Sequence, residues 1–345
     1  MTAGPRRGAT VAAALLLGAS PLWASWRHVV VPEAAELLRR SLDPSAASYE
    51  GLMRVEVFAG EIASAKQVSV RFQKPGRYRR EVLDASGRPE QIAVSNGRQE
   101  WIYDRGRNKV WQGEPADPEI KRLAPDDEFD LMMENYAVSA STADPVAARA
   151  CWRLELRARA DGRLQRRLWV DRKTALTLAS EDYRPQGGLA WSARFEKLSF
   201  PRRQKKSLFT FAPPPGAVVA KRFSADYLAL EDAKAAAGIE PRTPDWLPPG
   251  YVFESLDILP RGGSRIIHYR FSDGVNVLSL FQCPVKVKLD FGAAAAQTVR
   301  LAGGEGTLAW TQEGQALGWE KGHSRFLLVG PLSGETLKTV AESVR

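Results

Sequence analysis

Apolar and polar residues alternate along the chain from residue 49 to residue 111. The alternation is clear at Val68, Val70 and Phe72, where Ser69 and Arg71 occupy the intervening positions. A period of two predicts β-strands with one apolar face and one polar face. Consecutive strands of this kind form an antiparallel sheet, whose apolar face must be covered by helices or by a ligand.

The same pattern returns between residues 152 and 200. Leu154 and Leu156 alternate with charged residues, and a turn begins at Asp171. Turn residues separate the strands in both regions, and Asn96-Gly97 is the strongest hairpin signal in the chain. We therefore expect one sheet of about ten strands, a size at which open sheets tend to curl.

Two segments have the three- and four-residue spacing of apolar positions that is typical of helices. They span residues 32–42 and Asp126–Tyr136. Asp126, Asp127 and Glu128 suit the positive end of the second helix, so we interpret them as helix-stabilising and not as a metal or acid–base site. The apolar stripe of this helix is expected to pack on the sheet, and it contains Phe129, Met132, Met133 and Tyr136.

A stretch rich in proline follows the first sheet. Since prolines stiffen a linker, we expect a linker at residues 221–246, with a helix at residues 226–237. The second domain, residues 247–345, ends in a helix that Ser333 is expected to cap. Its predicted strands are residues 252–259, 265–271, 276–282, 298–301, 306–311, 315–321 and 324–329.

Length and the N-terminal pattern bear on domain count and location. At 345 residues the chain is longer than one core usually serves, which favours two domains. Arg6 and Arg7 precede a short apolar run, and Ala24 is a suitable cleavage residue, as in a Sec-type signal peptide of residues 1–24. The run is too short to span a bilayer. We therefore expect export, with an uncleaved signal anchor as the alternative.

The chain is basic, with a formal net charge of +9, which favours anionic partners. The basic residues are nevertheless spread along the whole chain. Arg77, Arg79 and Arg80 surround Tyr78 in a predicted strand. In an exported protein we interpret these arginines as contacts for an anionic lipid head group or a partner protein, and not for nucleic acid. The alternative is a solvated strand face.

The sequence carries no recognisable catalytic or metal-ligating motif. Its three histidines are His28, His268 and His323, and HExxH, GxSxG, phosphate-loop and dinucleotide patterns are missing. A dyad of His268 and Asp273 would have no nucleophile. We therefore expect no enzymatic activity, no metal site and no cofactor.

The chain has two cysteines, Cys151 and Cys283, one in each half. In an oxidising compartment they could form a disulfide between the domains. We interpret them instead as two separate buried thiols, because cysteine is among the most buried residue types.

Three motifs in the observed order resemble one known family. The start of LolA-like sheets is similar to Ser48-Tyr-Glu-Gly51 followed by Lys74-Pro-Gly-Arg-Tyr-Arg-Arg-Glu81. A family hairpin of the form L-W-V-D-x-x-T-x-L resembles Leu168-Trp-Val-Asp-Arg-Lys-Thr-Ala-Leu-Thr-Leu178. The opening of the family's small C-terminal domain resembles Leu247-Pro-Pro-Gly-Tyr251 and His268-Tyr-Arg-Phe-Ser-Asp-Gly274. The chain thus resembles the MucB/RseB regulators, whose large domain shares its fold with the lipoprotein carriers LolA and LolB.

The resemblance implies an α+β fold. Residues 25–220 would form a curled antiparallel LolA-like half-barrel with covering helices, and residues 247–345 a smaller mixed α/β domain. It also implies a non-enzymatic periplasmic regulator that binds the periplasmic segment of a membrane anti-sigma factor and senses lipid, lipopolysaccharide or envelope stress. The alternative is a periplasmic carrier of lipoprotein acyl chains or other lipid. No short motif here specifies the partner.

The resemblance further implies that the apolar sheet face is a lipid-sized cavity, because the relatives carry acyl chains there. Each buried methylene contributes about 0.8 kcal/mol, so apolar contacts alone can hold a long chain. The alternative is an ordinary core beneath helices. The residues expected to line the cavity are Val55, Val57, Val68, Val70, Phe72, Trp101, Met132, Met133 and Tyr136.

Overall fold

The computed structural model describes residues 31–59, 62–113, 115, 125–185, 187–221, 230–261, 263–287, 296–311 and 314–345. The predicted signal peptide, His28 and residues 226–229 of the predicted linker helix lie outside the described residues. The helices are α1 Ala34–Leu42, α2 Pro125–Asn135, α3 Ala233–Ala237 and α4 Gly334–Ser343, with short 3-10 helices η1 Lys206–Phe209 and η2 Leu230–Asp232.

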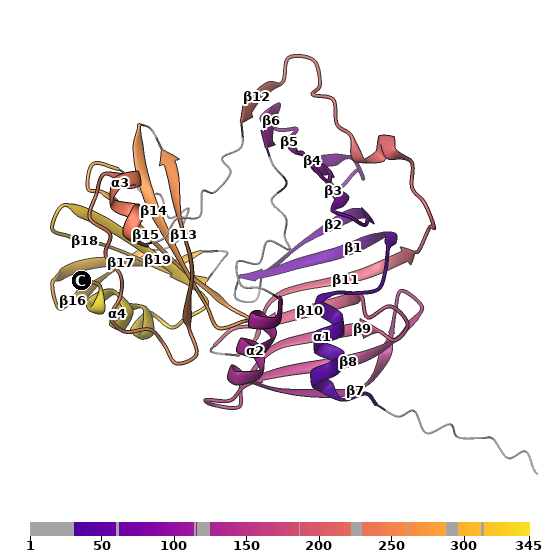
Figure 1. The fold of residues 1–345 in the computed structure, drawn as a ribbon, viewed down its shortest axis with the longest axis horizontal. Helices are drawn as coiled ribbons and strands as arrows, with labels where there is room; N and C mark the ends of the chain where they lie inside the picture. Colours follow the sequence, from indigo (N-terminus) through magenta and orange to yellow (C-terminus); the bar gives the residue numbers. More distant parts are fainter. Residues whose placement is uncertain are drawn as a thin grey trace, which may run out of the picture. The chain divides into compact units, whose positions relative to one another are not determined.

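The strands form two sheets (Figure 1). The first sheet contains β1 Ser48–Ala59, β2 Ile62–Gln73, β3 Arg77–Leu83, β4 Pro89–Asn96, β5 Glu100–Asp104, β6 Lys109–Gly113, β7 Tyr136–Val146, β8 Arg149–Ala158, β9 Leu164–Asp171, β10 Thr177–Tyr183, β11 Leu189–Ser199 and β12 Val218–Lys221. The second contains β13 Val252–Arg261, β14 Ser264–Ser272, β15 Val277–Pro284, β16 Ala296–Leu301, β17 Gly304–Thr311, β18 Gly314–Lys321 and β19 Ser324–Gly330.

The first sheet joins two meanders through the pairing of β1 with β11. Its strand order is β12-β6-β5-β4-β3-β2-β1-β11-β10-β9-β8-β7, and only the short β12 pairs in parallel, with β6. The sheet curls and remains open, with β12 and β7 as its edges (Figure 1). The predicted curled, mostly antiparallel sheet is therefore confirmed, with twelve strands in place of about ten.

Helices α1 and α2 pack on one face of this sheet, which we call the inner face (Figure 1). Leu38 of α1 and Met132 of α2 share a buried cluster with Leu154 of β8 and with Leu168 of β9. The strand register carries the inner face onward from Leu168 to Ser180, Ala193 and Val55, which lie directly opposite one another. The opposite side of the sheet is the outer face.

The second sheet has the order β13-β14-β15-β19-β18-β17-β16, and the pairings between its strands are antiparallel. All the predicted strands of this domain are present. Helix α4 packs Leu337 and Val340 against the sheet, and Ser333 caps it by accepting a hydrogen bond from the Thr336 N–H at 3.2 Å. This part of the chain thus combines helix α4 with a sheet whose strands pair antiparallel.

The predicted linker helix is shorter than expected. Within the described part of residues 226–237, only Ala233–Ala237 is α-helical, preceded by η2. Gly238 ends the helix with a φ of 73°, a conformation that glycine adopts without steric cost.

Cys151 lies in β8 and Cys283 in β15, both fully buried, and they are not joined in a disulfide. Burial raises the pKa of the Cys151 thiol, as expected for an unreactive core cysteine. The interpretation as two separate thiols is confirmed. No helix among the described residues is long and apolar enough to cross a membrane.

Candidate functional site

The inner face is covered by helices over one half of the sheet only, within the described part of the chain. Helices α1 and α2 contribute to the cluster over β7, β8 and β9. The half formed by β1 to β6 carries apolar side chains that are partly exposed and belong to none of the buried clusters of described residues, such as Val55, Val57 and Val82. Over β1 to β3 this half is a mostly apolar surface onto which a chain-like ligand could pack.

The register confirms that most of the predicted cavity residues share this face. Val68 lies opposite Met53 and Val82, and Phe72 lies opposite Tyr49 and Tyr78. Val70 lies between them on the same strand and is 7% exposed. Alternation within each strand therefore grouped Val55, Val57, Val68, Val70 and Phe72 correctly.

Trp101 was assigned to the wrong face. It pairs with Val94 and Gln112, whereas its neighbour Ile102 pairs with Ala93 and faces inward. On the outer face, the strand of Trp101 is covered in part by the segment after β11, where Tyr103 packs on Phe211 with ring centroids 5.7 Å apart. The error arises because a one-residue difference across a turn transfers every side chain of a strand to the other face.

Three of the predicted lining residues come from the α2 region, and they lie in the closed half. Met132 is 3% and Tyr136 2% exposed, and both belong to the cluster with Leu154 and Trp152. Met133 is partly buried against the same cluster. In this structure these residues form a core beneath helices, which was the alternative interpretation.

The three predicted head-group arginines do not converge. Arg79 lies on the outer face opposite Val94, and its guanidinium binds the Glu81 carboxylate at 2.7 Å. Arg77 shares that face, two residues earlier in β3. Arg80 faces inward between Val70 and Ala93 and is exposed. Only Arg80 therefore belongs to the apolar half of the inner face.

His268 does not meet Asp273. Its Nδ1 lies 3.6 Å from Asp257, its Nε2 lies 3.1 Å from the Ser279 hydroxyl, and its ring stacks on Phe281 at 4.3 Å. Asp257 and Ser279 were not singled out in the sequence, because their meeting depends on the register of β13, β14 and β15. Ser279 is only 9% exposed in mid-strand, and the described residues contain no group of His, Cys, Asp and Glu able to hold a metal.

Comparison with known proteins identifies the family. A family model of the MucB/RseB N-terminal domain matches residues 37–208. The chain is a MucB/RseB-like protein. No protein of curated function matches its sequence.

Solved structures show the same fold for this MucB/RseB-like protein. A chain from the MucA/MucB complex of Pseudomonas aeruginosa is 18% identical with a TM-score of 0.56, covering 91% of this chain and 99% of that one. A crystal structure of MucB in complex with MucA(peri) is 17% identical with a TM-score of 0.54, covering 91% and 98%. A crystal structure of MucB is 19% identical with a TM-score of 0.50, covering 90% and 97%.

A buried polar cluster joins the end of α2 to the turn between β14 and β15 in the MucB/RseB-like protein. The Tyr136 hydroxyl donates to the Asp273 carboxylate at 2.6 Å, and the Asn276 side chain donates to the Tyr136 oxygen at 3.1 Å. The Asn135 amide donates to the carbonyls of Gly250 and Asp273 at 2.9 and 3.0 Å. Burial and the adjacent Asp273 raise the pKa of Tyr136 well above its ordinary value.

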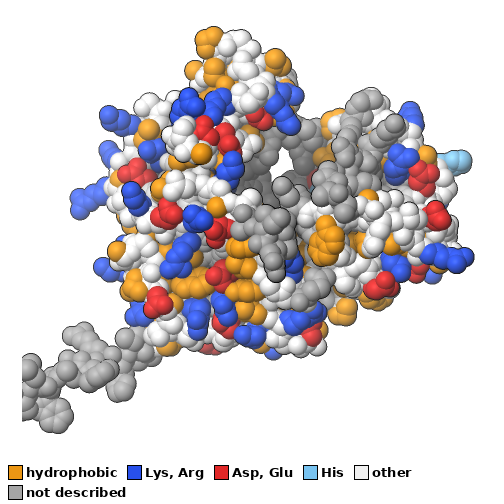
Figure 2. All heavy atoms as spheres, turned by 180° about the vertical axis from the view of Figure 1, so that it is seen from behind, with side chains coloured by type: hydrophobic (Ala, Val, Ile, Leu, Met, Phe, Trp, Pro, Cys, Tyr) orange, Lys and Arg blue, Asp and Glu red, His pale blue; other side chains and the backbone are white. Residues whose placement is uncertain are grey.

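The outer face is a network of paired charges, and Figure 2 shows basic and acidic side chains intermingled. Glu155 binds Arg157 at 3.0 Å and Arg167 at 2.9 Å. Burial alone would raise the pKa of Glu155, but the hydrogen bonds from these arginines outweigh it and lower the pKa. Because such charges neutralise each other, this network offers no concentrated site for an anion.

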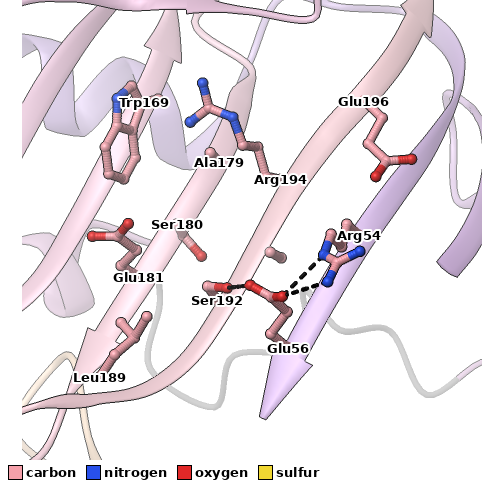
Figure 3. Close-up of a pocket in the computed structure, with 11 residues that line it drawn as sticks. Arg54, Glu56, Trp169, Ala179, Ser180, Glu181, Leu189, Ser192, Arg194 and Glu196 are labelled. Carbon is pink, nitrogen blue, oxygen red and sulfur yellow. Dashed lines mark hydrogen bonds and ion pairs between the residues drawn. The ribbon is translucent and has the colours of Figure 1, made fainter. Parts of the chain in front are cut away.

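A depression of about 220 Å³ lies on this outer face, over strands β1, β9, β10 and β11 (Figure 3). Arg54 binds Glu56 at 2.9 Å, and the Ser192 hydroxyl donates to Glu56 at 3.3 Å. Trp169 and Glu181 form the other side of the depression. The depression lies on the side of the sheet away from Val70 and Phe72, so it is separate from the predicted lipid surface.

The hairpin motif that begins at Leu168 has a structural explanation. Asp171, only 2% exposed, accepts two hydrogen bonds from the Arg149 guanidinium, both at 2.8 Å. The same carboxylate accepts from the Thr174 N–H at 2.9 Å and the Thr174 hydroxyl at 2.8 Å. The Asp and Thr of the motif therefore hold the turn between β9 and β10, and they have no direct role on the inner face.

Proposed function

We propose that this MucB/RseB-like protein is a non-enzymatic periplasmic regulator that binds the periplasmic segment of a membrane anti-sigma factor. The observation that carries the proposal is the fold match over 91% of the chain to MucB solved with MucA. The match spans both sheets, so it includes all the parts of the fold that MucB has in those complexes. The family model over residues 37–208 supports the same conclusion.

We further propose that lipid released under envelope stress binds the inner face between β1 and β6 and weakens the hold on the anti-sigma segment. The support is the apolar surface of Val55, Val57, Val68 and Phe72, which no described helix covers. An acyl chain packed there would gain about 0.8 kcal/mol for each buried methylene.

The first test is a direct binding measurement. We expect the full mature protein to form a complex with the purified periplasmic segment of a single-span anti-sigma factor encoded beside its gene, at micromolar or tighter affinity by calorimetry, about −8 kcal/mol or better. The cytoplasmic segment of the same anti-sigma factor serves as the control. Equal or undetectable binding of both segments would overturn the proposal.

A lipid carrier is the second candidate function, favoured by the same apolar surface. It predicts acyl chains in mass spectra of denatured protein purified from the envelope. Val68→Asp is expected to abolish uptake of a fluorescent fatty acid, because a carboxylate would be placed on the apolar surface. Ser69→Asp, one residue away on the outer face, should leave uptake unchanged. Uptake that survives Val68→Asp would place the lipid elsewhere.

A further inference from the structure

Arg80 lies in the middle of an apolar row on the inner face. The residues directly opposite one another along this row are Gly51, Val70, Arg80, Ala93, Ile102, Trp111 and Ala220. Val70 is almost fully buried, whereas Arg80 is exposed. Arg80 is therefore a cation flanked on both neighbouring strands by an aliphatic or a small residue, Val70 and Ala93.

The aromatic row next to it positions Arg80. The Arg80 guanidinium carbon lies 5.4 Å from the centre of the Tyr78 ring. That ring is itself held, because the Tyr78 hydroxyl donates to the buried Glu100 carboxylate. Glu100 lies on β5, two strands from Arg80, and its carboxylate reaches the Tyr78 hydroxyl across β4.

The other basic side chains on the inner face of β1 to β6 are opposed by acidic groups. Lys66 binds Glu90 at 2.7 Å, and Lys109 lies directly opposite Asp104. On the outer face Arg71 lies 3.5 Å from Glu50. Among the ion pairs of the described residues, Arg80 takes part in none. Its charge is therefore available to a ligand that also contacts the apolar row.

We infer that Arg80 selects the head group of the bound lipid: the inner face takes a single-chain lipid with an anionic head, held by the Arg80 guanidinium while its chain packs on the apolar row. A guanidinium presents a planar fork of donors that matches a carboxylate in a bidentate arrangement. This inference rests on the proposed lipid binding by the inner face. It adds that the ligand is anionic and that Arg80 binds its head group.

The test compares two probes of equal chain length, dodecanoate and 1-dodecanol, on the full mature protein by calorimetry. Arg80→Gln is expected to weaken dodecanoate binding about tenfold, equivalent to about 1.4 kcal/mol, and to leave 1-dodecanol binding within about twofold. The effect is modest because the guanidinium is exposed to solvent. Arg77→Gln removes the same charge from the outer face of the same strand and should change neither affinity.

Each outcome separates the two proposals. Wild-type protein that binds neither probe would overturn lipid binding at the inner face, and this inference with it. Wild-type protein that binds both probes, with no selective loss in Arg80→Gln, would overturn the role of Arg80 and leave lipid binding standing. An equal loss for both probes in Arg80→Gln would assign Arg80 to the packing of the sheet.

Discussion

Replacing Gly274 with alanine is expected to lower the free energy of unfolding by about 3 kcal/mol. Gly274 has a φ of 90°, a conformation that costs other residues about 1–2 kcal/mol. A Cβ at this position would also lie 2.9 Å from the backbone nitrogen of Met132 in α2. Overpacking of a filled site costs about 1–3 kcal/mol. Urea denaturation followed by circular dichroism would measure the change.

Gly87→Ala is the matched control. Gly87 has a φ of 77° in the turn after β3, and an added Cβ would meet no heavy atom within 4 Å. Its substitution is expected to cost only the backbone term, about 1 kcal/mol. If the two variants lose the same stability, the close approach of the β14–β15 turn to α2 does not exist in solution.

The contact at Gly274 links the helix that covers the inner face to the turn of the second sheet. Tyr136 follows α2 without a connecting loop, so its hydrogen bond to Asp273 places the turn against the end of that helix. Val275 also packs on the cluster that contains Met132 and Leu154. A ligand that displaced α2 would therefore have to break buried hydrogen bonds, which are costly to leave unmade.

The sequence predicted the strands best where alternation was strong and turns were marked. The seven strands of the second sheet were all located, because aliphatic residues repeat regularly between glycine-containing turns. Strand β7 was missed, since it is an edge strand with many small and polar residues and with Pro145 near its end. Such residues are typical of edge strands and weaken the alternation that reveals a strand.

The candidate site was predictable only within single strands. Val68, Val70 and Phe72 were grouped correctly because they alternate along β2. Trp101 was assigned to the wrong face, because the face of a residue in another strand depends on the register across each turn. The burial of Met132 and Tyr136 depends on where α2 packs, which the sequence pattern of the helix does not specify.

Replacing Asp171 with alanine is expected to lower the free energy of unfolding by about 3 kcal/mol, because it leaves the Arg149 guanidinium without its buried partner. Burial alone would raise the pKa of Asp171, but hydrogen bonds from Arg149 and Thr174 outweigh it and lower the pKa below its ordinary value. A carboxyl group with a lowered folded pKa contributes stability above its unfolded pKa and loses it as the pH falls through the folded value. The difference between wild type and Asp171→Ala should therefore be full at pH 7 and shrink below about pH 4.

Asp161→Ala is the control for this prediction, because it removes an aspartate that is paired with an arginine but is not buried. Asp161 also binds an arginine, Arg163, at 2.6 Å, but its side chain is 37% exposed in the turn after β8. Exposed pairs contribute about 0–1 kcal/mol, so this variant should change the unfolding free energy by less than about 1 kcal/mol. Chemical denaturation of both variants from pH 3 to pH 7 measures the two effects together. An Asp171→Ala variant as stable as Asp161→Ala would mean that Asp171 and Thr174 do not hold the β9–β10 turn.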